Sequence, residues 1–308
     1  MDSRDPRDDI VDFLKGLFPL KLAESWDNVG VLVDPRLPGE MVPADLPTNV
    51  LLTIDMTERV VEEAIEKGCN MIVAYHPSPF TSFKKVSSRN ITQKLVLKCI
   101  KNNILVYSPH TACDNASGGV NDWLASGVIA PQMYAWTPDR CGITEQDGKN
   151  IQAIPENPGD ILHTISPIVS LEDIEHGAGR GRLVTLQEPQ NLWSVVIRFK
   201  LHFGLRRVRF ALGNSLTMSN ATVRTVAVQA GSGGSVLKDV QADLFVTGEM
   251  SHHDILAANA KGISVLLAEH SNSERPFLYM LLEKLSKSFK PPRSFAVSEN
   301  DSDPIDIV

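Results

Sequence analysis

Short apolar runs, each about as long as one β-strand, alternate with amphipathic segments of helical length along most of the chain. The first half holds apolar runs at 49–54, 71–75 and 104–107, with helices expected over 8–18, from Asp55-Met56-Thr57-Glu58 to Gly68, and over 91–101. This alternation constrains the fold strongly, because parallel strands must be joined by crossover segments that are usually helices. The sequence therefore predicts an α/β protein with a largely parallel sheet.

The same alternation returns in the second half, after a stretch rich in Gly, Pro, Gln and Asn that carries weak strands at 165–169 and 183–186. An amphipathic segment at 192–203 is followed by expected strands at 208–212, 222–229, 244–247 and 263–268 and by helices at 252–260 and 276–287. We predict an N-terminal α/β lobe (1–130), a connecting Gly/Pro-rich region (131–190), a C-terminal α/β lobe (191–298) and a frayed polar tail (299–308).

Composition and charge disfavour several classes of protein. With 308 residues, 43% of them hydrophobic, the chain can bury two cores. The net charge of −7 makes direct nucleic-acid binding unexpected, and no apolar run approaches the ~18 residues that span a bilayer. The four cysteines are scattered, which argues against a thiolate zinc site or a disulfide framework. Because the first residues lack a secretory signal, we expect a cytoplasmic protein, with nuclear entry left open.

Histidines gather just beyond the carboxyl ends of the expected strands. Five of the eight have this placement, namely His76, His110, His252, His253 and His270. Ligands of α/β sheets bind at this edge. Carboxylates accompany the histidines, at Asp114, Glu249 and Glu274. Imidazole and carboxylate groups together suit a divalent metal such as Zn, Fe or Mn, although a single loop histidine is more often a surface or hydrogen-bonding residue.

Three further segments allow two interpretations each. The glycine-rich segment 230–235 could cradle an anion with its amides or form only a tight strand-to-helix turn. The basic stretch from Arg198 to Arg209 could be a solvated helix face, or could attract a phosphate-bearing substrate if it lines a cleft. The segment Trp26 to Gly30 has a turn-like Asn-x-Gly, and its pattern alone assigns it no role.

Five ordered sequence blocks resemble the signature blocks of one protein family. They are SWDNVGVLVD at 25–34, YHPSPF at 75–80, YSPHTACD at 107–114, TGEMSHHD at 247–254 and AEHSNSER at 268–275. The resemblance is to the NIF-three-like family, the Ngg-one-interacting-factor-three homologues, and most of all to its animal-type members. Bacterial relatives are labelled GTP cyclohydrolase I type 2 homologue.

The resemblance implies a two-lobed NIF-three-like fold with mixed, largely parallel sheets and a site for divalent metal between the lobes. The implied metal ligands are His76, Asp114, His270 and Glu274, with His110, His252 and Tyr75 as polar neighbours of the ligands. Many members have a second histidine where this chain has Tyr75. The resemblance therefore implies one or two metal ions per chain.

Two functions follow as hypotheses. The first is a metal-dependent hydrolase acting on a phosphate-bearing or nucleotide-like substrate, with Glu274 bridging the metal site and Glu249 or Glu269 as general base. The second is a non-catalytic protein-interaction factor with a role in transcriptional regulation, as the family name implies. The resemblance also implies a homo-oligomer.

Overall fold

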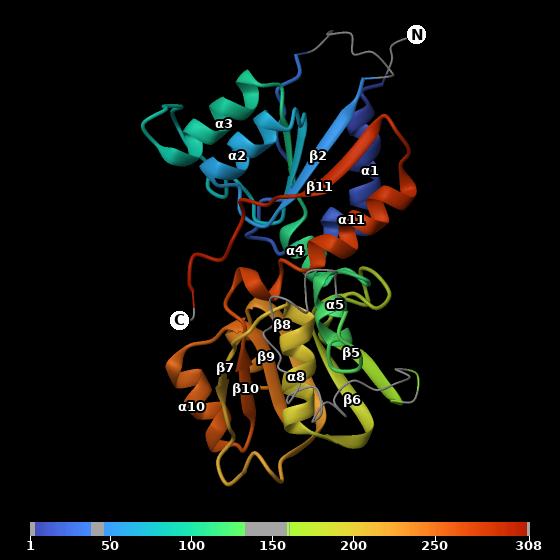
Figure 1. The fold of residues 1–308 in the computed structure, drawn as a ribbon, viewed down its shortest axis with the longest axis vertical. Coiled ribbons are helices and arrows are strands. Elements are labelled where there is room, and N and C mark those ends of the chain that lie inside the picture. Colours follow the sequence, from blue (N-terminus) through green and yellow to red (C-terminus); the bar gives the residue numbers. More distant parts are fainter. Residues whose placement is uncertain (1–3, 38–45, 133–158, 160, 307–308) are drawn as a thin grey trace. The chain divides into compact units, whose positions relative to one another are not determined.

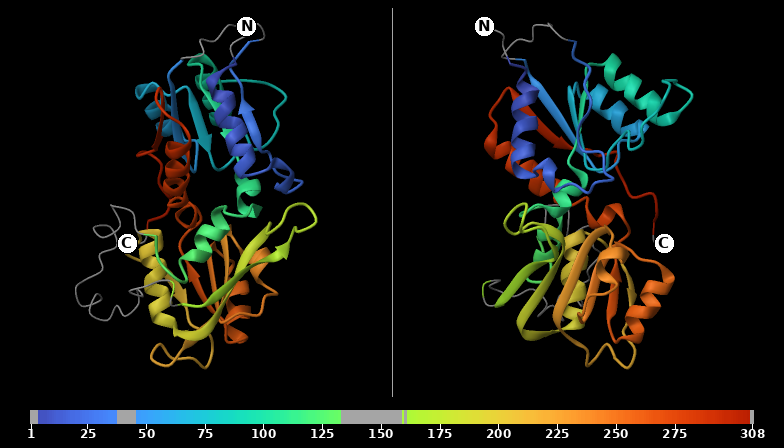
Figure 2. Two further views of the ribbon diagram at one scale, coloured as in Figure 1. Left: turned by 90° about the vertical axis from the view of Figure 1, so that its right-hand side faces the viewer. Right: turned by 180° about the vertical axis from the view of Figure 1, so that it is seen from behind.

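The chain folds into two compact units, each built around its own sheet. The computed structural model describes residues 4–37, 46–132, 159 and 161–306. The first unit contains Met1–Ala116 and Phe277–Ser302, and the second contains Ser117–Pro276 and Asp303–Val308. The predicted α/β class is confirmed, with one mixed sheet in each unit (Figures 1 and 2).

The first unit has a five-stranded sheet in which four strands are parallel. The strand order is β1 (Gly30–Val33), β4 (Leu105–Ser108), β3 (Met71–Ala74), β2 (Thr48–Thr53) and β11 (Arg293–Val297). Only β1 runs antiparallel to its neighbour, β4. Three carboxyl ends, those of β2, β3 and β4, therefore meet at one edge, as the sequence predicted.

Helices cover both faces of this sheet. In Figures 1 and 2, α2 (Glu58–Glu66) and α3 (Ile91–Lys101) lie on one face, and α1 (Pro6–Leu17) and α11 (Phe277–Ser288) lie on the other. The N-cap residues of α1, α2 and α3 are Asp5, Thr57 and Asn90. The side chain of each accepts a hydrogen bond from a backbone N–H group in the first turn of its helix. The core under α2 and α3 includes Leu51, Ile72, Val106, Val60, Leu95 and Cys99.

The second unit has a six-stranded sheet with more antiparallel pairing. Its order is β5 (His163–Ser170), β6 (Gly179–Asn191), β8 (Thr222–Ser232), β9 (Leu244–Glu249), β10 (Ser264–Leu267) and β7 (Arg209–Ala211). Strands β8, β9 and β10 are parallel, whereas β5, β6 and β7 join by antiparallel pairs. The accompanying helices are α5 (Val120–Ser126), α8 (Leu192–Phe203), α9 (Gly234–Leu237) and α10 (His252–Ala260).

The boundaries of the two units differ from those of the predicted lobes. The predicted connecting region supplies β5 and β6 to the second sheet, and its residues 133–158 and 160 lie outside the described residues. The last helix and β11 return to the first unit, because β11 pairs in parallel with β2 from Arg293–Thr48 to Val297–Leu52. A single edge strand of five residues gives little periodic signal, so the sequence did not reveal this return.

The first residues after β11 are bonded to α2. The buried carboxylate of Glu63 accepts the backbone N–H groups of Glu299 (3.0 Å) and Asn300 (3.2 Å) and the hydroxyl of Ser298 (2.5 Å). Burial works to raise the pKa of Glu63, but these bonds and that from Lys67 outweigh it and lower the pKa to about 2. The first part of the tail is therefore fixed by a charge on α2.

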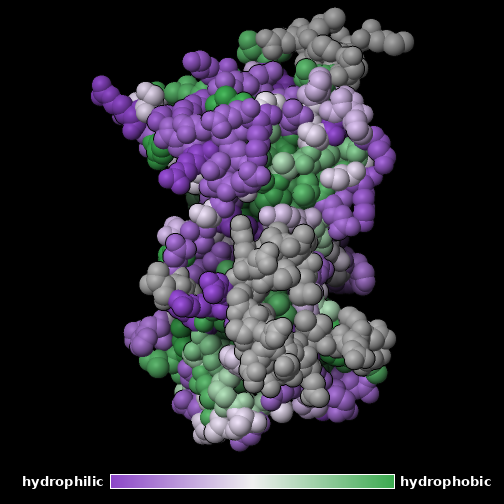
Figure 3. All heavy atoms as spheres, viewed as in Figure 1, coloured by the Kyte–Doolittle hydropathy of each residue, from purple (hydrophilic) through white to green (hydrophobic). Residues whose placement is uncertain are grey.

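The surface over α2 and α3 is polar. Figure 3 shows hydrophilic residues gathered there, and Lys98 lies 2.8 Å from Glu58 and 2.9 Å from Glu62. Among the described residues, no helix combines the length and the apolar character needed to cross a membrane.

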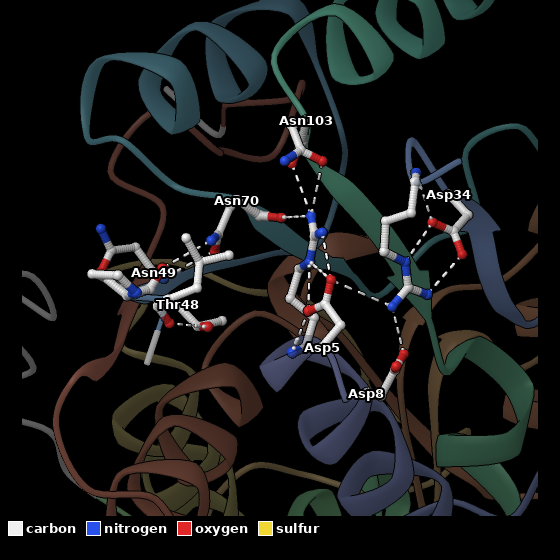
Figure 4. A network of polar contacts seen from close by, with 11 residues as sticks. Asp5, Asp8, Asp34, Thr48, Asn49, Asn70 and Asn103 are labelled. Atoms are coloured by element: carbon white, nitrogen blue, oxygen red, sulfur yellow. Dashed lines mark hydrogen bonds and ion pairs between the residues drawn. The ribbon is translucent and has the colours of Figure 1, made fainter. Parts of the chain in front are cut away.

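A buried guanidinium joins the amino ends of the strands in the first unit (Figure 4). Arg7 is 1% exposed and pairs with Asp5 at 2.7 Å. It also donates to the backbone carbonyls of Asn70 (3.4 Å) and Asn103 (3.0 Å). Asn70 directly precedes β3, and Asn103 lies two residues before β4. The carboxamide of Asn70 in turn bonds Asn49 N–H at 3.1 Å, so this edge is closed by a bonded network.

Candidate metal centre

In the first unit, strand pairing carries a histidine alongside a carboxylate. Pairing of β2 with β3 continues past both strands, because Tyr75 N–H donates to Thr53 (2.9 Å) and His76 N–H donates to Ile54 (3.0 Å). This brings His76 beside Asp55, with Nδ1 2.9 Å from Oδ1. The imidazole is half-buried, with 21% of its side chain exposed.

A second histidine at this edge has a fully buried carboxylate partner. His110 Nδ1 lies 2.7 Å from Oδ1 of Asp27, whose side chain is 0% exposed. The other oxygen of Asp27 accepts the N–H of Thr111 at 3.1 Å and its hydroxyl. Burial works to raise the pKa of Asp27, but the bonds from His110 and Thr111 outweigh it and hold the pKa below its ordinary value. Asp27 is thus a charged support for His110.

Tyr75 contacts the residue that the family resemblance marks as a ligand. Its hydroxyl donates a hydrogen bond to the carboxylate of Asp114. Its ring packs edge-on against His76, with centroids 5.3 Å apart, and against His110, at 5.9 Å. Tyr75 therefore orients the carboxylate of Asp114. By the resemblance, many family members have a histidine at the position of Tyr75.

An exposed aromatic pair lies beside these rings. Trp26 is 60% exposed and Phe80 is 47% exposed, with ring centroids 6.1 Å apart. The two loops are tied by Asn28, whose amide donates to the carbonyl of Pro79 at 2.7 Å. Trp26 also packs edge-on against His110, with centroids 6.0 Å apart. The pair forms a solvent-exposed aromatic surface next to His110.

The second unit repeats the histidine–carboxylate arrangement on β9 and β10. Pairing again continues past the strands, because Ala268 N–H donates to Thr247 (3.1 Å) and Glu269 N–H donates to Gly248 (3.0 Å). Glu269 then adopts a left-handed backbone, with φ 71°, and the chain turns into His270. His270 Nδ1 lies 2.9 Å from Oε1 of Glu249.

The other ring nitrogen of His270 faces a buried carboxylate. Nε2 lies 3.5 Å from Oε1 of Glu274, whose side chain is 4% exposed. A Cβ added at Gly231, which has φ +64°, would lie 2.6 Å from that oxygen and 3.0 Å from Nε2. The glycine-rich segment thus ends β8 in a turn that leaves room at both candidate ligand atoms.

These donors fit a first-row divalent metal. In three places a carboxylate binds Nδ1 of a histidine, at His76, His110 and His270. A proton held between Nδ1 and a carboxylate leaves the lone pair on Nε2, and metal-ligating histidines are commonly supported in this way. Imidazole nitrogen combined with carboxylate oxygen suits Zn, Fe or Mn. Each unit carries donors of this kind.

Other predicted residues lie apart from these contacts or take other partners. His252 begins α10, where its ring contacts His253 with centroids 5.4 Å apart. Glu269 forms an ion pair with Arg209, at 2.5 Å. His202 is fully buried on α8, where Nδ1 accepts Gln132 N–H and Nε2 lies 3.0 Å from the carbonyl of Trp123. His202 is therefore a structural histidine.

Sequence reasoning missed two carboxylates. It did not assign Asp27 or Asp55 to the site, although each binds a histidine. Asp55 lies two residues after the end of β2, so its strand-end position was a usable signal, which its place in a helix-capping sequence obscured. Asp27 comes from the loop before β1, and only its occurrence in the first signature block could have pointed to it.

Comparison with known proteins gives a consistent result. The family model Duf34/NIF3 (NGG1p interacting factor 3) matches residues 6–304. NIF3-like protein 1 of Rattus norvegicus is 36% identical, over 94% of this chain and 89% of its own length. NGG1-interacting factor 3 of Saccharomyces cerevisiae is 34% identical, over 97% of this chain and 96% of its own length.

Solved structures share the fold. A hypothetical protein of Staphylococcus aureus has a TM-score of 0.69 at 24% identity, covering 98% of both chains. Reduced HcgD from Methanocaldococcus jannaschii also has a TM-score of 0.69, at 18% identity, covering 97% of this chain and 98% of its own. The family match and the full-length relatives agree with the five sequence blocks, and this chain belongs to the Duf34/NIF3 family.

Proposed function

We propose that the chain binds one or two divalent ions of Zn, Fe or Mn. His76 and Asp114 are the proposed ligands of the first unit, and His270 and Glu274 those of the second. The observation that carries the proposal is the repeated pairing of a strand-end histidine with a carboxylate through Nδ1, which readies Nε2 as a ligand. Asp27 supports His110 in the same way.

We further propose that the metal centre hydrolyses a phosphate-bearing or nucleotide-like substrate. A divalent ion there would supply a Lewis acid for the phosphoryl group and a means to ionise water near neutral pH. The separation of 3.5 Å between Oε1 of Glu274 and Nε2 of His270 supports Glu274 as a ligand of this proposed centre. The exposed rings of Trp26 and Phe80 provide a surface on which the planar base of a nucleotide can stack.

The hydrogen-bond partners favour distinct roles for the acidic residues. Glu249 binds Nδ1 of His270 and is half-exposed, which favours a positioning role over that of general base. Glu269 is buried and paired with Arg209, so it is a poor candidate for proton transfer. Tyr75 holds Asp114 but supplies no imidazole, which favours a centre with fewer protein ligands than one with two histidines.

A screen of phosphomonoesters, phosphodiesters and nucleotides tests the hydrolase. The protein is assayed after loading with Zn, Fe or Mn, beside the variants His270→Ala and Glu274→Gln. Hydrolysis that falls by about 100-fold or more in both variants would support the proposal. His163→Ala is the control, because His163 is exposed and its Nδ1 bonds a nearby backbone carbonyl of the same unit. Turnover that is unchanged in the site variants would overturn it.

A second candidate is a protein-interaction role in transcription. It rests on the yeast relative, which is named NGG1-interacting factor 3. On this proposal the chain acts at least partly in the nucleus and binds a partner that corresponds to NGG1, and it forms a homo-oligomer. Binding of that partner by the His270→Ala variant would separate this role from metal chemistry, and its loss with the fold intact would link the two. Light scattering gives the oligomeric state.

A further inference from the structure

We infer that a pocket in the second unit, lined by Arg206 and Arg207, binds the phosphate of the substrate. The pocket has a volume of about 450 Å³, within the range of small-molecule sites. Its lining residues are Leu205, Arg206, Arg207, Ala268, Asn272, Ile305 and Asp306. The identity of the substrate rests on the proposed function, whereas the anion-binding property of the pocket stands on its own.

Strand direction places the two arginines at the same edge as His270. β7 runs antiparallel to β10, with Arg209 opposite Leu267. The beginning of β7 therefore lies beside the carboxyl end of β10, and the residues just before β7 are brought to the loop that holds Ala268, His270 and Asn272. The pocket lining contains residues from both segments, Arg206 and Arg207 from one and Ala268 and Asn272 from the other.

The loop that carries the arginines is fixed at both ends. Before it, α8 ends at Gly204 in a left-handed conformation with φ 68°, and Leu205 N–H donates to Lys200 at 3.0 Å. After it, Arg209 enters β7 and pairs with Glu269. This arrangement preorganises the loop, which lowers the entropic cost of binding an anion.

The charges in the pocket favour an anion. Two guanidinium groups, from Arg206 and Arg207, stand against the one carboxylate of Asp306. Guanidinium groups match the geometry of phosphate oxygens and can bind them by two parallel hydrogen bonds. Asn272 adds an amide donor, and Leu205 and Ile305 provide apolar walls. Arg206 and Arg207 of the basic stretch noted in the sequence thus line this pocket, whereas Arg209 pairs with Glu269.

Calorimetric titration with inorganic phosphate and pyrophosphate tests the inference on the full chain with chelator present, so that no metal contributes. The change Arg206→Ala should weaken binding about tenfold or more. Arg224→Ala is the matched control, because Arg224 is an exposed arginine of β8 in the same unit and its loss changes the net charge equally. Asp306→Asn should strengthen binding by removing the like charge.

Three outcomes would overturn the inference. The first is that the wild-type protein binds neither anion. The second is that Arg206→Ala and Arg224→Ala weaken binding equally, which would show a general charge effect. The third is that Asp306→Asn weakens binding. The double change His270→Ala, Glu274→Gln separates the two proposals. If this double variant loses hydrolysis but still binds the anion, the anion is bound in the pocket and not at the metal site. If Arg206→Ala hydrolyses the substrate with unchanged KM, the pocket does not bind the substrate, and the proposed hydrolase is unaffected.

Discussion

The two edges of the first unit's sheet both carry polar side chains, but they use them differently. At the amino edge, buried Arg7 gives its donors to Asp5 and to backbone carbonyls before β3 and β4. At the carboxyl edge, His76 and His110 are partly exposed, and each binds a carboxylate through Nδ1. The first edge satisfies its charge within the fold, whereas the second concentrates acidic groups and imidazoles.

This difference separates residues that stabilise the fold from residues that fit a ligand. A closed network such as that of Arg7 offers nothing to a metal, and its loss leaves buried groups unpaired. The carboxyl edge instead pairs each imidazole with a carboxylate through Nδ1, an arrangement that leaves Nε2 available to a metal. The second unit repeats the carboxyl-edge arrangement with Glu249, His270 and Glu274.

The largest expected effect is on stability, at the amino edge. Arg7→Met should lower the free energy of unfolding by about 3–5 kcal/mol, because the buried carboxylate of Asp5 loses its partner at 2.7 Å and keeps Arg36 at 3.6 Å. Metal content should remain that of the wild type. Arg4→Met is the control, since Arg4 pairs with Asp9 and Asp12 on the exposed side of α1 and its loss should leave the unfolding midpoint unchanged. Equal unfolding midpoints for Arg7→Met and Arg4→Met in denaturant titrations would show that the buried network of Arg7 does not stabilise the fold more than an exposed ion pair.

The next effect is on metal binding, at Gly231, which lies beside the proposed ligand atoms of His270 and Glu274. Gly231→Ala puts a Cβ 2.6 Å from Glu274 and 3.0 Å from His270, so metal affinity should fall by about 100-fold. Gly68→Ala is a matched control, because its φ of +63° is nearly equal and no atom lies within 4 Å of the added Cβ. Both variants should lose about 1–3 kcal/mol from backbone strain. Equal metal affinity in the two would show that the clash does not matter.

A smaller effect is expected from the carboxylates that hold Nδ1. Asp55→Asn and Glu249→Gln should each weaken metal binding about 10–100-fold, measured by competition with a chromogenic chelator, with little change in stability. Glu172→Gln is the control, because Glu172 pairs with the exposed His176 through the same ring atom. Unchanged affinity in both site variants would mean that the histidines need no such support.

The effect that is smallest over a single pH unit is the acid sensitivity that the structural histidine His202 confers on stability. Burial lowers the pKa of His202 to about 3, despite a bond to the carbonyl of Trp123 that works to raise it. The unfolded chain therefore takes up this proton first, so stability should be present above pH 6.5 and fall as the pH drops from 6.5 toward 3, by about 1 kcal/mol per unit.

The variant His202→Gln should remove this share of the acid sensitivity. His163→Gln should keep it, because His163 is exposed. The unfolding midpoints of the two variants are measured between pH 7 and 5. If the midpoints of both fall equally with pH, His202 does not contribute to the acid sensitivity.

The sequence predicted those parts of the site that follow from strand ends. His76 and His270 follow strands with clear apolar runs, so their edge could be inferred from periodicity alone. Asp27 could not be placed, because it reaches His110 from a loop 83 residues away in the chain. The return of β11 to β2 was also hidden, because pairing of strands distant in sequence leaves no local signal.

The most direct test is the metal content of the purified chain and of one variant from each unit. Elemental analysis should find one or two divalent ions per wild-type chain. Both His76→Ala and His270→Ala should lose metal, because each change removes a proposed ligand, whereas the control His163→Ala should keep it. Wild-type protein that binds no divalent ion after loading, or a His270→Ala variant with undiminished metal, would contradict the account.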